Sequence, residues 1–401
     1  EKKAPATRTT VHNPEQALKG EFSAAADTVD PVALADRLVA IGPGAAPSIL
    51  RGLCGHLDLE ALDEAGTGAP ADIRDRALRD AWARYSPAIR LAAIEDEADF
   101  AGTDGARVLI GLAGETGDAA AVPLVLELAG RLDPIQLARP YVVEPIERAL
   151  ITCLPAALES RAVANQLAAL RGPLSEIVAR AAILCGSALA QEIAFAHLGR
   201  STATDLALLV TLTTPGLDTR RTLHGPQLET LRTLTTARSP EIRRAACVAI
   251  GHARDGGGVE ELVACLDDID PLVCSAARNS LRLSTGKDKG ASTEEWQSWL
   301  EERTRWLDEV APGIVETIRG EDYEQVVSSV DRLFERGDAR QEWTELCTEL
   351  LDSDSPRVVR RATEALLQIG SADELLAIEH ARARLGGPRL RMLEAALTAA
   401  Q

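Results

Sequence analysis

The fold is decided by two stretches of the chain, SPEIRRAACVAIG (Ser239–Gly251) and SPRVVRRATEALLQIG (Ser355–Gly370). Each opens on a serine that can cap a helix, followed by a proline suited to the first helical position. Each then places aliphatic residues and alanine at helical spacing and closes on a glycine suited to a left-handed helix end. Each stretch therefore predicts one amphipathic helix that stops at Gly251 or Gly370.

Four further segments share this pattern, which indicates an internal repeat. All six segments carry an aliphatic residue early in the predicted helix, and the distance between these residues measures the repeat. It is 32 residues from Ile146 to Val178 and 31 residues from Ile242 to Val273. A unit of about 31–37 residues fits a helical hairpin, which can bury its apolar stripe only against neighbouring hairpins. We therefore expect an all-α fold, an α-solenoid of roughly nine or ten stacked antiparallel helical hairpins. The four further segments are Pro70–Trp82, Glu144–Leu154, Ser175–Gly186 and Asp270–Gly286.

The composition of the 401 residues agrees with a protein that buries a core. Hydrophobic residues make up 46% and charged residues 26%, which excludes wholesale disorder. Aromatic residues make up only 3%, so the core must be built from Leu, Ala, Val and Ile. The formal net charge of −18 argues against nucleic acid as a partner, because phosphate neutralisation needs clustered positive charge. No apolar run of about 18 residues is present, so we predict no membrane span.

The repeat pattern is interrupted once, in a segment rich in tryptophan. Trp296, Trp299 and Trp306 fall on one face of an expected helix. They either fill the stack where its regular packing is interrupted or anchor a partner protein, since tryptophan is favoured in interface hot spots. The predicted segments are a polar N-terminal tail at 1–20, a solenoid at 21–286, the Trp-containing interruption at 287–312 and a C-terminal solenoid at 313–401.

The S/D-P-x-[IV]-R-R-A pattern of these segments resembles the second helix of HEAT repeats, including the phycobilisome-lyase-like HEAT repeats, in proteins of bacterial type. The resemblance extends from about Val32 to the C-terminus. It implies a HEAT-like solenoid that serves as a scaffold or a complex subunit. It also implies a structural ladder, in which an arginine early in each second helix pairs with an acidic residue of a neighbouring repeat. The ladder residues would be Arg74, Arg243 and Arg360.

Charge is concentrated in two blocks. Residues 294–354 hold 18 acidic and 6 basic residues, whereas residues 219–254 hold 7 arginines and 2 acidic residues. Such blocks either form a solvated face or recognise an oppositely charged partner. The partner would be another protein, basic where it meets the acidic block, or a second copy of the chain through head-to-tail charge pairing. The predicted partner-binding residues are Arg220, Arg221, Arg244, Arg361, Trp296, Trp299, Glu301, Glu302, Asp308 and Glu309.

Sequence patterns of catalysis and metal binding are missing. No histidine lies four residues from another, and neither H-E-x-x-H nor G-x-x-x-x-G-K-[ST] occurs. The paired His-Glu motifs of the HEAT-like deoxyhypusine hydroxylases are also absent. We therefore predict no catalytic residue, no metal and no cofactor, and a scaffold that binds a partner protein along its inner helices. Two alternatives stay open: a phycobilin-lyase-like or chaperone-type enzyme subunit that handles a cofactor, and a HEAT-like DNA-repair protein.

The seven cysteines form no C-x-x-C pair and lie mostly in apolar, helix-like stretches. This placement is typical of small buried hydrophobic residues. A bridge between Cys265 and Cys274 remains an open alternative, because spacing alone does not decide it.

The opening stretch, EKKAPATRTTVHNPEQALKG, is polar and contains no apolar run. Two locations are compatible with it: the periplasm or cell envelope after removal of a signal peptide, and the cytoplasm.

Overall fold

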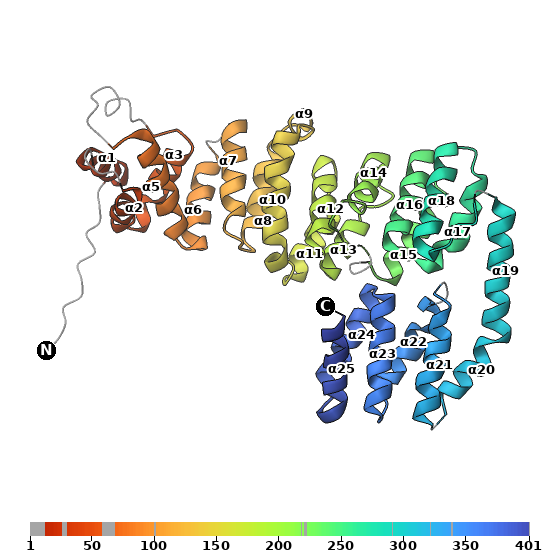
Figure 1. Cartoon of the computed structure of the whole chain (residues 1–401). Helices are drawn as coiled ribbons and strands as arrows, with labels where there is room; N and C mark the ends of the chain where they lie inside the picture. Colours follow the sequence, from red (N-terminus) through yellow and green to blue (C-terminus); the bar gives the residue numbers. More distant parts are fainter. Residues whose placement is uncertain are drawn as a thin grey trace. The chain divides into compact units, whose positions relative to one another are not determined.

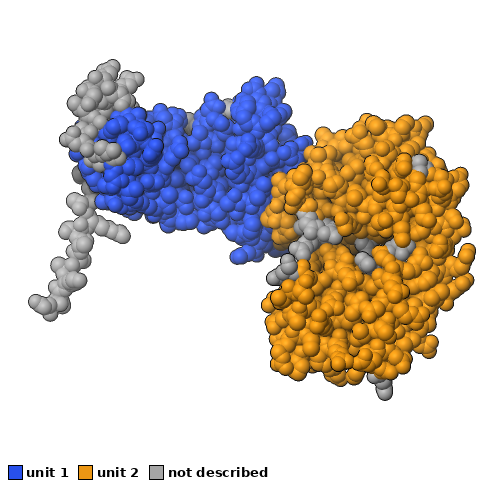
Figure 2. All heavy atoms as spheres, in the orientation of Figure 1, with its two compact units in different colours: residues 1–181 blue, residues 182–401 orange. Residues whose placement is uncertain are grey.

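The computed structural model describes residues 13–25, 30–57, 69–99, 102–217, 219, 223–290, 292–320, 322–337 and 340–400. All regular structure within these ranges is helical, as the sequence predicts. The chain divides into two compact units, residues 1–181 and residues 182–401 (Figure 2). The predicted segment boundaries at 286 and 312 therefore fall inside the second unit.

The first unit is a stack of sequential helix pairs (Figure 1). The second helices of successive pairs form a row, in which α2 packs closely on α5 and α7 packs closely on α10. The outer helices α3, α6 and α8 pack against one side of this row. The helices are α1 (Pro14–Ala24), α2 (Pro31–Ala40), α3 (Ala46–Leu53), α5 (Ala71–Arg84), α6 (Pro87–Ala98), α7 (Thr103–Gly114), α8 (Ala121–Gly130), α9 (Pro134–Leu137), α10 (Pro140–Ala157), α11 (Arg161–Ala169) and α12 (Pro173–Cys185).

The second unit continues the pattern of stacked hairpins, with α16 packed closely on α18 and α23 on α25. A 3-10 turn, η4 (Cys265–Asp267), precedes α18, and another, η5 (Arg340–Trp343), precedes α22. The helices are α13 (Ala188–Phe195), α14 (Thr202–Thr211), α15 (Gly225–Leu234), α16 (Pro240–Ala253), α17 (Val259–Ala264), α18 (Pro271–Thr285), α19 (Thr293–Glu309), α20 (Ala311–Ile318), α21 (Tyr323–Glu335), α22 (Thr344–Leu350), α23 (Pro356–Ile369), α24 (Ala372–Arg384) and α25 (Gly387–Ala399).

The predicted cap residues explain where the repeat helices begin. The Ser239 hydroxyl accepts a hydrogen bond from the backbone N–H of Ile242 at 3.3 Å, and the Asp270 carboxylate accepts one from Leu272 at 2.8 Å. In both helices the next residue is a proline, whose missing N–H would have no partner in the first turn. Local sequence therefore starts these two helices, whereas Ser355 occupies the N-cap position of α23 without the predicted side-chain hydrogen bond.

The predicted helix end at Gly370 is confirmed, since this residue adopts the left-handed conformation with φ of 70°. The same prediction for Gly251 is wrong. Helix α16 runs on to Ala253, and Arg254 takes the left-handed position with φ of 51°. Gly251 instead lies against α18, where an added Cβ would come within 2.8 Å of the Ser280 Cα. This glycine allows two helices to approach closely.

The expected tail at 1–20 is wrong for residues 14–20, which belong to α1. Asn13 caps this helix by accepting a hydrogen bond from the Gln16 N–H at 3.1 Å. Leu18 and Phe22 are fully buried, so the helix is held by its apolar stripe although most of its residues are polar. The rest of the expected tail, residues 1–12, lies outside the described residues.

Close helix packing predicts opposite effects for two glycines of α7. A Cβ on Gly114 would lie 2.6 Å from the Ala149 Cα in α10, whereas one on Gly111 would meet nothing within 4 Å. We expect Gly114→Ala to destabilise the protein by about 1–3 kcal/mol through overpacking. Gly111→Ala should be neutral or stabilising by up to about 1 kcal/mol, because alanine favours the helix. Urea unfolding followed by circular dichroism compares the two, and equal midpoints would contradict the close approach.

Candidate functional site

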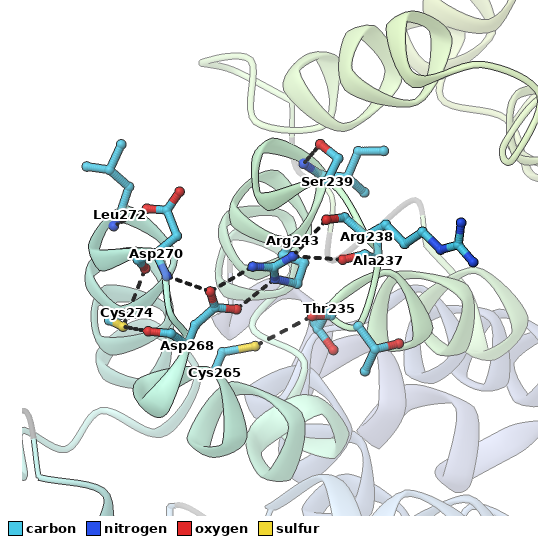
Figure 3. A network of polar contacts seen from close by, with 12 residues as sticks. Thr235, Ala237, Arg238, Ser239, Arg243, Cys265, Asp268, Asp270, Leu272 and Cys274 are labelled. Carbon is cyan, nitrogen blue, oxygen red and sulfur yellow. Dashed lines mark hydrogen bonds and ion pairs between the residues drawn. The ribbon is translucent and has the colours of Figure 1, made fainter.

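Arg243 lies in a network of polar contacts that joins neighbouring hairpins (Figure 3). Its Nε and Nη2 donate to the two carboxylate oxygens of Asp268, each at 2.7 Å. Its Nη1 donates to the carbonyl oxygen of Ala237 at 2.9 Å. The guanidinium group lowers the pKa of Asp268, which also accepts a hydrogen bond from the Asp270 N–H. Since Asp268 belongs to the next hairpin, Arg243 makes the contact that the ladder prediction describes.

The cysteines beside this network are free thiols. Cys265 donates to the carbonyl oxygen of Thr235 and Cys274 to that of Asp268. Because both sulfurs are directed to backbone carbonyls and both residues are free, the bridge that the sequence left open is not formed. A hydrogen bond with Cys265, together with burial, raises the pKa of Cys247.

The roles predicted for Arg360 and Arg361 are wrong. Arg360 is exposed and pairs with Glu364 of its own helix at 2.8 Å, so it joins no neighbouring repeat. Arg361 pairs with Asp331 of α21 at 2.5 Å and lies over the Phe334 ring, with 12% of its side chain exposed. Arg361 is therefore a structural residue and is not free to bind.

Arg360 and Arg361 thus have each other's predicted roles, and the register of the helix explains why. Counted from the capping serine, Arg360 occupies the position of the exposed Arg244, one residue beyond that of Arg243. The Arg-Arg dipeptide of α23 is therefore shifted by one residue, or about 100° around the helix. Arg74, the remaining predicted ladder residue, is buried, with 5% of its surface exposed. Arg220 and Arg221 lie outside the described residues.

Trp296 and Trp299 were predicted as partner anchors, and the structure places them in the core. They are 0% and 5% exposed, and their rings meet edge to face at 5.5 Å. The indole N–H of Trp296 donates to the Gly290 carbonyl oxygen at 3.3 Å. Trp306 packs against Trp343 in the same way, at 6.1 Å. These rings fill the interruption of the stack, which was the other interpretation.

The acidic residues predicted on α19 are exposed. Glu301, Asp308 and Glu309 face solvent, and Glu302 lies 3.9 Å from Arg336 of α21. The carboxylates of this helix are therefore exposed, whereas Trp296 and Trp299 of the same helix are buried.

A groove that sequence reasoning missed lies in the first unit between α5 and α7. The backbones of these two helices do not pack closely, although α5 packs on α2 and α7 packs on α10. The groove has a volume of about 750 Å³. It is lined by Leu53, Arg79, Asp80, Trp82, Ala83, Arg107, Val108, Gly111, Leu112, Gly114, Glu115, Pro145, Arg148, Ala149 and Thr152. Gly111 of α7 lies at this groove, and a Cβ added to it would meet no atom within 4 Å.

A second hollow, of about 490 Å³, lies within the second unit. Its charges are largely satisfied by neighbours: Arg232 donates to Asp255 at 2.7 Å, and His224 Nδ1 lies 2.8 Å from Asp373 Oδ1. Glu374 is 3% exposed and hydrogen-bonded. We assign no ligand to this hollow. The charged residues that line it are Arg232, Asp255, Glu342, Glu345, Asp373 and Glu374.

Metal-binding clusters and membrane-spanning helices are both absent from the described ranges. Those ranges contain no group of three or more His, Cys, Asp or Glu side chains that could hold a metal ion. Nor does any helix within them have the length and apolar character needed to cross a bilayer.

The ladder contact predicts that Arg243→Ala destabilises the protein by about 2 kcal/mol, because the charged hydrogen bonds to Asp268 are lost. Arg360→Ala removes an exposed pair on one helix and should cost about 0.5 kcal/mol or less. Chemical denaturation of the two variants measures both values. Equal losses would contradict the difference between the two arginines.

The lowered pKa of Asp268 predicts a pH dependence. The ion pair stabilises the folded state fully above the unfolded pKa of about 3.9 and loses this effect as the pH falls through the lower folded value. The difference in melting temperature between wild type and Asp268→Asn should therefore be largest near neutral pH and shrink below about pH 4. A constant difference from pH 7 to pH 3 would contradict this assignment.

The chain matches no family model and no curated protein sequence. Among solved structures, it is similar to a crystal structure of an engineered protein from a structural genomics consortium, at 14% sequence identity and a TM-score of 0.25. That similarity covers 97% of this chain and 99% of the engineered protein. What the fold itself establishes is an all-α protein of sequentially packed helices that resemble repeats.

Proposed function

We propose that this protein is a non-catalytic interaction scaffold of HEAT-type repeats that binds another protein along its second helices. The HEAT assignment is supported by the Arg243–Asp268 pair, which joins one hairpin to the next. The binding role rests on one observation, the groove between α5 and α7. At about 750 Å³ the groove lies within the range typical of ligand sites.

The walls of the groove are suited to docking without rearrangement. They are formed by helices whose other faces are buried, with Ala77 and Leu78 of α5 and Ile110 of α7 at 2% exposure or less. A preformed surface loses little conformational entropy when a partner binds. Binding at this groove therefore requires mainly a partner of complementary shape.

The exposed carboxylates of α19 supply a second, electrostatic surface in the proposal. Glu301, Asp308 and Glu309 would attract a basic region of the partner and raise its association rate at low salt. Exposed charges are screened by salt, so this contribution should decline as ionic strength rises.

The groove predicts that one bulky substitution abolishes partner binding. Gly111→Trp fills the open space above α7, where a Cβ added to the glycine would meet no atom within 4 Å. Gly20→Trp is the matched control, because Gly20 is another helical glycine with nothing within 4 Å of an added Cβ. Wild type and both variants are used as bait in lysate of the native cell, and captured proteins are quantified by mass spectrometry.

We expect a stoichiometric protein that wild type and Gly20→Trp retain and Gly111→Trp loses. Circular dichroism verifies that both variants are folded. Capture of the same proteins in the same amounts by all three baits would overturn the assignment of the groove.

A further inference from the structure

The second unit contains two helix stacks that pack separately. We call α13–α18 the N-terminal stack and α20–α25 the C-terminal stack (Figure 1). The C-terminal stack has an apolar core of its own, whose buried members all lie between Ala311 and Leu393. Among the described helices, no member of one stack packs closely on a member of the other. Two bodies that share no apolar core can move relative to each other.

Helix α19 joins the two stacks and is attached to each of them at a different place. Near its start it packs on α17, and the Thr293 hydroxyl donates to the Asp267 carboxylate at 2.8 Å. Near its end it packs on α20, and the ring of Trp306 meets that of Trp343. Between these attachments, at residues 300–305, no side chain of α19 is buried. The helix is therefore a connecting arm between the stacks and belongs to the interior of neither.

The 490 Å³ hollow lies between the two stacks, and both supply its walls. The N-terminal stack supplies Arg232 and Asp255, which pair with each other at 2.7 Å. A negative wall thus faces a wall whose own charges are already neutralised. The charged residues that the C-terminal stack supplies are Glu342, Glu345, Asp373 and Glu374.

One polar contact spans the gap between the stacks. Nδ1 of His224, the residue before α15, lies 2.8 Å from Oδ1 of Asp373 in the first turn of α24. Because a carboxylate only accepts hydrogen bonds, the imidazole N–H is the donor. Both side chains stay partly exposed, at 25% and 51%, so water can replace the bond when the stacks separate. This contact can therefore form and break without unfolding either stack.

We propose that the second unit is a hinged clamp, in which the two stacks turn about α19 and the His224–Asp373 hydrogen bond holds the hollow closed. Opening would expose the carboxylates of Glu345 and Glu374 to solvent. The inference goes beyond the scaffold function proposed above. It concerns a different part of the chain from the α5–α7 groove, so either proposal can fail while the other stands.

The test exchanges the two partners of the bond. His224→Asp places a carboxylate opposite Asp373, and the repulsion should open the clamp. Aspartate is also suited to the N-cap position that His224 occupies, so α15 should still form. The double variant His224→Asp/Asp373→His restores the pair in reverse. His380→Asp is the matched control, because it makes the same substitution at an exposed histidine that does not line the hollow. Melting temperatures verify that each variant is folded.

Pulsed electron paramagnetic resonance measures the distance between spin labels at Ala203 in α14 and Ala395 in α25. Both positions are exposed, and several helices separate each of them from α19. The labels are attached to genetically encoded ketone side chains, because the native cysteines would react with thiol labels.

We expect one short distance population in wild type, in His380→Asp and in the double variant. His224→Asp should shift most molecules to a longer and broader distribution. An unchanged distribution in His224→Asp would overturn the proposal, and so would a double variant that keeps the longer distances.

Discussion

Every hairpin in this chain depends on burying an apolar stripe that it cannot bury alone. The stripes are made of alanine and medium-sized aliphatic residues, and a fully buried leucine or isoleucine contributes about 1.5–3 kcal/mol. Because the side chains are small, the helices must lie close together for the stripes to meet. Gly114 against Ala149 and Gly251 against Ser280 are the points of closest approach among the glycines of these helices. The spacing of the helices therefore decides both the stability of the stack and where it remains open.

Both units contain charges that are paired across neighbouring elements and charges that are not. In the second unit, Arg243 and Arg361 are directed to carboxylates of neighbouring elements, and the charges around the 490 Å³ hollow are mostly paired. In the first unit, Arg51 and Arg180 pair across elements in the same way, whereas the groove-lining Arg79, Asp80, Arg107 and Glu115 form no ion pair within the described residues. Residues 294–354 were predicted to bind a partner because of their negative net charge. Net charge, however, does not show which carboxylates are already paired with a cation. For recognition, the unpaired groups count for more than the total.

The sequence predicted the helices well because their determinants are local. Ser239, Asp270 and Pro240 act within a single turn, and the repeat of the aliphatic anchors requires neighbours to stack. Predictions that depended on orientation were less successful. The Arg-Arg dipeptides of α16 and α23 look alike, but their register relative to the capping serine differs by one residue, and this exchanged the roles of Arg360 and Arg361. The groove could not be predicted, because it results from the distance between α5 and α7, which no local pattern encodes.

The uneven spacing along the row of second helices has a mechanical consequence. Where α7 meets α10, backbone touches backbone, and the pair must move as a rigid block. Between α5 and α7 the backbones do not pack closely, so this joint lacks that constraint. A partner segment bound in this groove, as proposed, would contact the helices on both sides of the joint at once. Occupancy of the groove would therefore restrict how far α5 and α7 can move against each other.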